Sequence, residues 1–282
     1  MGRRGQAYFQ FQQFLIAQDR CAMKVGTDGM LLGAWTSIPP QARVLDIGTG
    51  TGLVALMLAQ RSPQAQIDAL EVDLKACEQA RENVACSPWI HRIQVHHQSL
   101  QAWIRRARVP PSRAAHRPPY TLIVANPPYF PRSSSSTLNP RTQARQQTSL
   151  SLEVLFQGVA ACLHPQGQFS MIYPFQDHVA ALAQAQVLGL HCTRLWQVKP
   201  RPQLPPKRSL LEFSWRFRVP ERAEISLEHS RHCYTADYAA LLRPFLLRYA
   251  KASKSALVPA EIDAGHLKPS SGSLAPDRDP SP

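Results

Sequence analysis

Residues 43–56 read Arg-Val-Leu-Asp-Ile-Gly-Thr-Gly-Thr-Gly-Leu-Val-Ala-Leu, and this stretch decides the fold that we expect. Its first five residues are typical of a short buried strand. Glycines then stand at positions 48, 50 and 52, and the apolar residues after them predict a helix. Because glycine has no Cβ, such a turn lets the backbone come close to a ligand. A strand, a glycine-rich turn and a helix in this order predict a nucleoside-binding βαβ unit.

A second strand is predicted at residues 66–70, and it ends in Glu71. A carboxylate about twenty residues after a glycine-rich turn is placed to hold ribose hydroxyls. The Gly-x-Gly-x-Gly spacing differs from the dinucleotide pattern, and no Walker lysine follows it. We therefore expect a nucleoside ligand without a pyrophosphate, and S-adenosylmethionine fits this description.

A further apolar run at residues 120–125 ends in Asn126-Pro127-Pro128-Tyr129. An amino group conjugated to a ring becomes nucleophilic when acceptors hold its hydrogens. The Asn126 side-chain oxygen and the Pro127 carbonyl are two such acceptors, and neither proline brings a competing N–H. Tyr129 adds a ring face, and stacking on it is worth about 1–3 kcal/mol per base.

The Asn-Pro-Pro-Tyr tetrapeptide alone is equally compatible with an ordinary rigid turn after a strand. The glycine-rich turn and the acidic strand end upstream favour the chemical interpretation. S-adenosylmethionine would also bring the electrophile, a sulfonium methyl group, that an amine held at this site would attack.

The chain has 282 residues, of which 44% are hydrophobic, and a formal net charge of +13. We expect one folded domain at residues 9–250, between a flexible basic tail at 1–8 and a disordered Ser/Pro-rich tail at 251–282. The charge favours a nucleic-acid partner. Arginines cluster in a proline-rich insertion, residues 105–119, that we expect to lack regular structure, and in a mobile substrate loop, residues 130–148.

The six cysteines include no Cys-x-x-Cys pair, which is typical of reduced thiols in a cytoplasmic protein. His229, His232 and Cys233 form the densest group of metal-ligand residue types, but no second ligand pair stands at a matching spacing. The apolar runs are too short to span a bilayer. We therefore expect no metal and no membrane partner, and we favour a monomer.

Three segments together resemble a known family: residues 14–35, 46–52 and 126–129 are similar to the bacterial tRNA adenine-N6 methyltransferases that modify valine tRNA beside its anticodon. The resemblance extends from about residue 9 to about residue 249. It is specific, because Met-Lys-Val-Gly-Thr-Asp-Gly at residues 23–29 is absent from most other Asn-Pro-Pro-Tyr enzymes.

The resemblance implies an α/β, Rossmann-like class I methyltransferase. It has a seven-stranded, mostly parallel sheet whose last strand runs antiparallel, with helices on both faces. Within this fold we expect a helix from Met30 to Trp35 and a final helix over residues 234–249.

The activity that the resemblance implies is methylation of N6 of the adenine 3′ of the anticodon, position 37, in valine tRNA. The catalytic residues would be Asn126, Pro127 and Tyr129. The cofactor would contact Lys24, Thr27, Asp28, Asp46, Gly48, Thr49, Gly50, Gly52, Glu71, Ser99 and Asn126. The RNA would contact Arg20, Arg132, Arg141, Arg145, Lys207 and Arg208.

Ser99 departs from the family's pattern, because an Asp usually stands there and accepts a hydrogen bond from the cofactor's adenine amino group. A serine hydroxyl can still accept a hydrogen bond. We expect a modest loss of cofactor affinity and no loss of activity.

Three alternatives remain at the level of sequence. A protein glutamine-N5 methyltransferase acting on release factors fits the same tetrapeptide, but it would need an N-terminal helical bundle, and the strand at residue 43 leaves little room for one. A ribosomal RNA guanine-N2 methyltransferase shares the core, but such enzymes commonly double the domain. A non-catalytic RNA-binding protein would not need an intact Asp46, Glu71 and Asn126.

Overall fold

The computed structural model describes residues 7–108, 119–128 and 150–249. The chain divides into two units, residues 1–250 and 251–282, and all of the described residues belong to the first. Several predictions therefore lie outside the described residues: those for Tyr129, for the loop 130–148 with Arg132, Arg141 and Arg145, for most of the insertion, and for the C-terminal tail.

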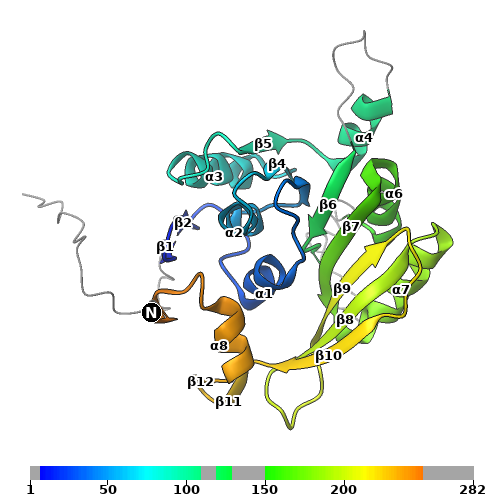
Figure 1. The fold of residues 1–282 in the computed structure, drawn as a ribbon. Coiled ribbons are helices and arrows are strands. Elements are labelled where there is room, and N and C mark those ends of the chain that lie inside the picture. The colour runs from blue at the N-terminus through cyan, green and yellow to red at the C-terminus, as the bar shows by residue number, and fades with distance from the viewer. Residues whose placement is uncertain (1–6, 109–118, 129–149, 250–282) are drawn as a thin grey trace, which may run out of the picture. The chain divides into compact units, whose positions relative to one another are not determined.

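An eight-stranded sheet forms the centre of the fold, in the order β10-β8-β9-β7-β6-β3-β4-β5 (Figure 1). Five of its strands are parallel to one another. They are β3 (Arg43–Ile47), β4 (Gln66–Glu71), β5 (Ile93–His97), β6 (Tyr120–Ala125) and β7 (Leu163–Pro174). The predicted Rossmann-like α/β fold is confirmed.

The remaining strands reverse direction. The hairpin of β8 (His191–Lys199) and β9 (Arg208–Ser214) inserts β9 between β7 and β8, antiparallel to both, as we expected for the last strand. The predicted count of seven strands is wrong, because β10 (Glu221–Ser226) adds an eighth strand parallel to β8 at the sheet edge. Most residues of β10 are polar, and the two apolar residues that alternate with them, Ala223 and Ile225, are too few to predict a strand from the sequence.

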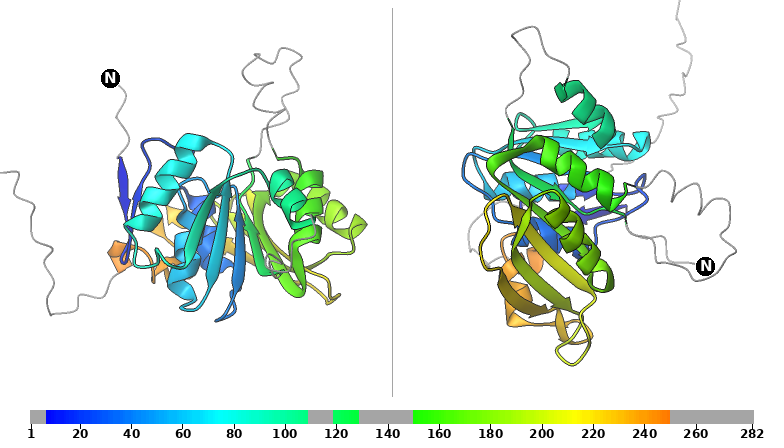
Figure 2. Two further views of the ribbon diagram at one scale, coloured as in Figure 1. Left: turned by 90° about the horizontal axis from the view of Figure 1, so that it is seen from above. Right: turned by 90° about the vertical axis from the view of Figure 1, so that its right-hand side faces the viewer.

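Helices cover both faces of the sheet, and each face has its own apolar core (Figure 2). On one face lie α1 (Thr27–Trp35), α2 (Leu53–Arg61) and α3 (Leu74–Ala85). On the other lie α4 (Leu100–Arg108), α6 (Leu152–Cys162) and α7 (His178–Val187), the last preceded by η1 (Phe175–Asp177).

Two helix boundaries differ from the predictions. Helix α1 begins at Thr27 rather than Met30, so Thr27 and Asp28 lie in its first turn. Residues 105–108 of the predicted insertion are helical, because α4 continues to Arg108.

The two ends of the first unit pack together. Strands β1 (Tyr8–Gln10) and β2 (Leu15–Ala17) form an N-terminal hairpin, and Tyr8 belongs to β1 rather than to the predicted tail. Phe11, between these strands, forms an isolated bridge with Leu246. Both side chains are buried, so this contact joins the N-terminal hairpin to the end of the unit.

The predicted final helix over residues 234–249 is too long. A short hairpin of β11 (Glu228–Ser230) and β12 (Cys233–Tyr234) precedes α8 (Ala236–Leu242), and η2 (Leu247–Tyr249) follows it. The Thr235 hydroxyl accepts a hydrogen bond from the Tyr238 N–H at 3.2 Å and caps the helix start. Pro244 cannot donate to a continuing helix, so α8 ends before it.

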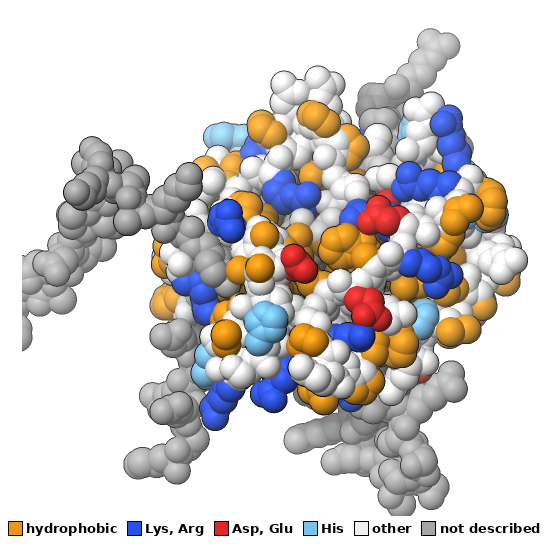
Figure 3. All heavy atoms as spheres, turned by 60° about the horizontal axis from the view of Figure 1, so that its bottom comes forward, with side chains coloured by type: hydrophobic (Ala, Val, Ile, Leu, Met, Phe, Trp, Pro, Cys, Tyr) orange, Lys and Arg blue, Asp and Glu red, His pale blue; other side chains and the backbone are white. Residues whose placement is uncertain are grey.

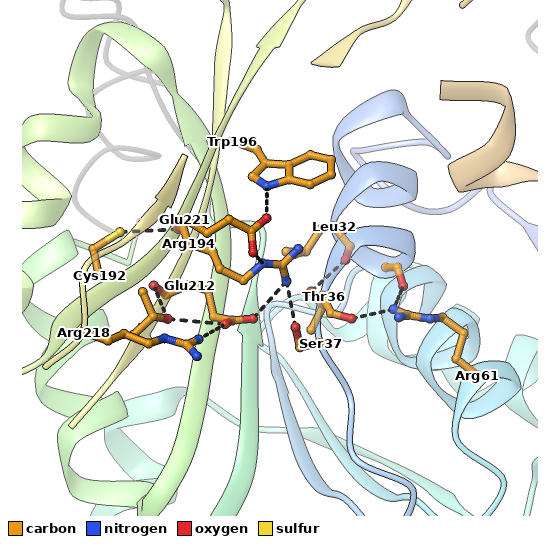
Figure 4. A network of polar contacts seen from close by, with 12 residues as sticks. Leu32, Thr36, Ser37, Arg61, Cys192, Arg194, Trp196, Glu212, Arg218 and Glu221 are labelled. Atoms are coloured by element: carbon orange, nitrogen blue, oxygen red, sulfur yellow. Dashed lines mark hydrogen bonds and ion pairs between the residues drawn. The ribbon is translucent and has the colours of Figure 1, made fainter. Parts of the chain in front are cut away.

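A polar network fixes the carboxyl end of α1 to strands β8–β10 (Figure 4). Glu212 on β9 is fully buried, and Arg194 on β8 lies 3.3 Å from it. The same Arg194 group donates to the Ser37 hydroxyl at 2.7 Å, just after α1. On the other side, Arg61 donates to the Thr36 carbonyl at 2.7 Å. The helix that carries Thr27 and Asp28 is therefore held firmly against the sheet.

Candidate active site

The site lies where the parallel strands end. Strand β3 pairs with both β4 and β6, with Ile47 opposite Leu70 on one side and Ala125 on the other. The next residues of these three strands are Gly48, Glu71 and Asn126. Because parallel strands present their carboxyl ends at the same edge, the sheet brings the three predicted site residues together.

The glycine-rich turn needs glycine for its backbone conformation. Gly48, Gly50 and Gly52 have φ values of 72°, 58° and 83°, which residues with a Cβ rarely adopt. A Cβ added to Gly48 or Gly50 would meet nothing within 4 Å. The turn therefore borders open space at the sheet edge, where a ligand can lie close to the backbone.

Asp46, at the end of β3, is only 2% exposed. Its Oδ2 accepts a hydrogen bond from the Thr49 hydroxyl at 2.6 Å. Burial raises the pKa of Asp46 to about 7, and the Glu71 carboxylate adds to this shift, while the hydrogen bonds from Thr49 and Ala55 oppose it. The carboxyl group therefore titrates close to neutral pH.

Glu71 is held rigidly at the end of β4. Its Oε2 accepts from the Gly50 N–H at 2.8 Å, and its Oε1 accepts from the N–H groups of Val72 and Asp73 at 2.8 and 3.0 Å. Because each carboxylate oxygen can accept two hydrogen bonds, Oε2 keeps one acceptor position. This arrangement fits a carboxylate that both shapes the turn and receives a ribose hydroxyl.

The Asn126 side-chain oxygen is buried and makes no hydrogen bond within the described ranges. Pro127 beside it is buried, and Pro128 is exposed. An acceptor left unpaired in the interior costs about 1–3 kcal/mol. A ligand that donates a hydrogen bond at this point would remove that cost.

The predicted contacts to the methionine end of the cofactor come from the start of α1. Lys24 is exposed, whereas Thr27 and Asp28 are half-buried. Asp28 Oδ2 lies 2.9 Å from Nε of Arg208, the first residue of β9. This ion pair ties the α1 segment to the β8–β9 hairpin, so Arg208, which we predicted to bind RNA, has a structural partner.

Ser99 serves as a helix cap. Its hydroxyl accepts from the Ala102 N–H at 3.2 Å, and its carbonyl accepts from the Trp103 N–H at 2.9 Å, in the first turn of α4. An aspartate can cap a helix in the same way. The serine therefore caps α4 in the way that an aspartate at this position would.

Two of the other predicted RNA contacts are described. Arg20 forms an ion pair with Glu82 of α3, and Lys207 is exposed just before β9. On the face in Figure 3, Lys and Arg side chains stand at several separate places with acidic side chains among them. Charge alone therefore does not define an RNA-binding patch on that face.

The described residues include neither a candidate metal site nor a candidate membrane-spanning helix. Among the residues that the structure describes, no group of three or more His, Cys, Asp and Glu side chains is arranged to hold a metal ion. In the same part of the chain, no helix is long and apolar enough to cross a membrane.

Curated relatives match the chain over most of its length. The tRNA1(Val) (adenine(37)-N6)-methyltransferase of Trichodesmium erythraeum is 42% identical over 86% of this chain and 98% of its own. The enzyme of that name from Bacteroides fragilis is 43% identical over 86% of this chain and 99% of its own. The chain belongs to the tRNA1(Val) (adenine(37)-N6)-methyltransferase family.

A model of the methyltransferase small domain matches residues 26–185, from the residue before α1 to within α7. The fold agrees with that of a solved structure described as a predicted O-methyltransferase from Agrobacterium tumefaciens. That structure is 21% identical, with a TM-score of 0.54 over 76% of this chain and 95% of its own.

The sequence pattern did not single out two buried amides of this family member, Gln79 and Asn83 of α3. They make hydrogen bonds with the segment before α1 and with the glycine-rich turn. A signal was present in the sequence, because these two polar residues stand four apart on the helix face that carries the buried Ala76 and Ala80.

Proposed function

We propose that this protein transfers a methyl group from S-adenosylmethionine to N6 of adenine 37 in valine tRNA. The observation that carries the proposal is the buried Asn126 oxygen, which has no hydrogen-bond partner among the described residues, beside the open glycine-rich turn. The relatives whose names state this activity match this chain over almost their whole length, and they support the same substrate. With such a substrate, the protein would act in the cytoplasm.

The residues at the strand edge fit the cofactor. Glu71 would accept hydrogen bonds from ribose hydroxyls, and the backbone of Gly48, Thr49, Gly50 and Gly52 would border the ligand. Lys24, Thr27 and Asp28 would surround its methionine end, and Ser99 its adenine. When bound, S-adenosylmethionine supplies an electrophilic methyl group on a positively charged sulfur.

The chain's part in the transfer is to hold the target amine. Asn126 Oδ1 and the Pro127 carbonyl would each accept one hydrogen of the adenine amino group, so that its lone pair points at the methyl carbon. Tyr129 would stack on the flipped base. The surplus proton leaves the nitrogen after the methyl group has transferred, so the site needs no strong general base.

RNA contacts beyond the target base would come from the same edge. Lys207 stands exposed at the base of the β8–β9 hairpin, and its N–H donates to the Val198 carbonyl at 2.9 Å. We propose that Lys207 and Arg20, with Arg132, Arg141 and Arg145, meet phosphates of the anticodon stem and loop. Arg208 would contribute while it is paired with Asp28.

Replacing Asn126 with Ala tests the catalytic assignment. The variant should lose turnover on tRNA by about two orders of magnitude or more, as an enzyme does when it loses one transition-state hydrogen-bonding group. Its dissociation constant for S-adenosylmethionine, measured by calorimetry, should stay within about threefold of wild type. An equal loss of cofactor binding would contradict the role given to Asn126.

A further inference from the structure

Two carboxamide side chains are buried on one face of α3. Gln79 is 0% exposed and Asn83 is 4% exposed, and they stand one helical turn apart. Their hydrogen bonds go to other segments of the chain and none to α3 itself. Buried amides paired with other segments in this way fix the segments that they contact.

Asn83 joins two walls of the candidate cofactor site. Its Oδ1 accepts from the Ala17 N–H at 2.8 Å, and its Nδ2 donates to the Ala17 carbonyl at 3.0 Å. The same Nδ2 donates to the carbonyl of Thr51 at 2.9 Å. Ala17 ends β2, and Thr51 lies between Gly50 and Gly52 of the glycine-rich turn. One amide therefore holds both segments at once.

Gln79 continues this pairing along the chain. Its Oε1 accepts from the Arg20 N–H at 3.2 Å, and its Nε2 donates to Asp19 at 2.5 Å. Further on, the Gln18 side chain accepts from the Val25 N–H at 2.8 Å and closes the segment on itself. Residues 17–25 are thus fixed at their beginning, middle and end, just before Thr27 and Asp28.

The segment also lies beside the acidic end of β4. Burial raises the pKa of Cys21 to about 11, and the carboxylates of Glu71 and Asp73 add to the shift by repelling the thiolate. Cys21 must therefore be near these two carboxylates. Together with the bonds of Asn83 to Ala17 and Thr51, this puts residues 17–25 beside the glycine-rich turn.

We propose that Asn83 and Gln79 are positioning residues that preorganise the cofactor cleft, with Asn83 as the link between residues 17–25 and the glycine-rich turn. The inference rests on the proposed function, because it assigns the cleft to S-adenosylmethionine. The amide offers donors and an acceptor together, which neither a carboxylate nor an ammonium group does. Holding both walls before binding lowers the entropy lost when the ligand binds.

The main variant is Asn83→Asp, which keeps the shape and the acceptor for Ala17 N–H but loses the donors to two carbonyls. Calorimetry near pH 8 should show a dissociation constant for S-adenosylmethionine about tenfold higher than wild type. Turnover at saturating cofactor and tRNA should stay within about twofold. Toward pH 5 the ratio of the two dissociation constants should shrink, because a protonated aspartate regains one donor.

Val84→Ala is the matched control, because Val84 neighbours Asn83 on α3, is 4% exposed and packs in the apolar core. It should lower the melting temperature and leave the dissociation constant unchanged. Gln79→Met, a second variant, should raise the dissociation constant and speed hydrogen exchange at the Arg20 amide. It gives a result even if Asn83→Asp does not fold.

Unchanged cofactor affinity in Gln79→Met and Asn83→Asp would overturn the inference, as would an equal loss of affinity in Val84→Ala. A wild-type protein that does not bind S-adenosylmethionine would instead contradict the proposed function. In that case, exchange at the amides of Ala17, Arg20 and Val25 still decides whether the two amides hold the segment. Fast exchange there in the wild type would refute the positioning role by itself.

Discussion

The buried Asp46 predicts that cofactor binding depends on pH. Its pKa is raised from 3.8 to about 7, chiefly by burial, so the carboxyl group is about nine-tenths protonated near pH 6. A ligand that brings a sulfonium and an ammonium group to the adjacent turn favours the ionised carboxylate. Below pH 7, binding must therefore release a proton, and the affinity should fall by about tenfold between pH 8 and pH 6.

Calorimetry of S-adenosylmethionine binding near pH 6, 7 and 8, in buffers with different ionisation enthalpies, measures both the affinity and the proton released. Near pH 7 about half a proton should leave per cofactor bound. Asp46→Asn is the control, because the amide has nearly the same shape and does not titrate, while the cofactor's own amino group titrates alike in both experiments. The same pH dependence in wild type and Asp46→Asn would refute the reasoning.

Three further predictions concern Asp46, Ser99 and the ion pair of Asp28 and Arg208. Because folding raises the pKa of Asp46, the folded state holds a proton that the unfolded state loses between about pH 4 and about pH 7. The unfolding free energy should therefore fall over this range, by up to about 1.4 kcal/mol per pH unit. Urea unfolding of Asp46→Asn should lack this slope. Ser99→Asp should keep the cap of α4 and lower the dissociation constant for S-adenosylmethionine, measured by calorimetry, by up to about tenfold. A weaker affinity would contradict the role given to Ser99. For the ion pair of Asp28 and Arg208, urea unfolding of Asp28→Asn, Arg208→Gln and the double variant should give a coupling free energy of about 0.5–3 kcal/mol. Additive losses of unfolding free energy would show that the pair does not stabilise the fold.

The sequence was sufficient for the parallel part of the sheet, because strands such as β3 and β6 are buried on both faces and appear as short apolar runs. It was insufficient for β10, where only Ala223 and Ile225 alternate with polar residues. The start of α1 was missed because its N-cap, Gly26, has no side chain to signal a cap. The early end of α8 could have been predicted from Pro244.

The candidate site, like the fold, could be predicted from the sequence only in part. Gly48, Glu71 and Asn126 could be grouped from the sequence, because parallel strands must end at one edge. The pairing of Asp28 with Arg208, 180 residues apart, could not, since no local pattern encodes a contact at that separation. The partners of Asn83 were hidden for the same reason, although its place on the apolar face of α3 was visible.

The most direct test of the proposed function is methyl transfer to a valine tRNA transcript that lacks modifications, followed by nuclease digestion and mass spectrometry. The account predicts one N6-methyladenosine, in the fragment that contains adenine 37, and no methylation of a transcript with guanine at that position. Methylation at another nucleotide, or label that enters only a release factor or ribosomal RNA when these are offered, would contradict it.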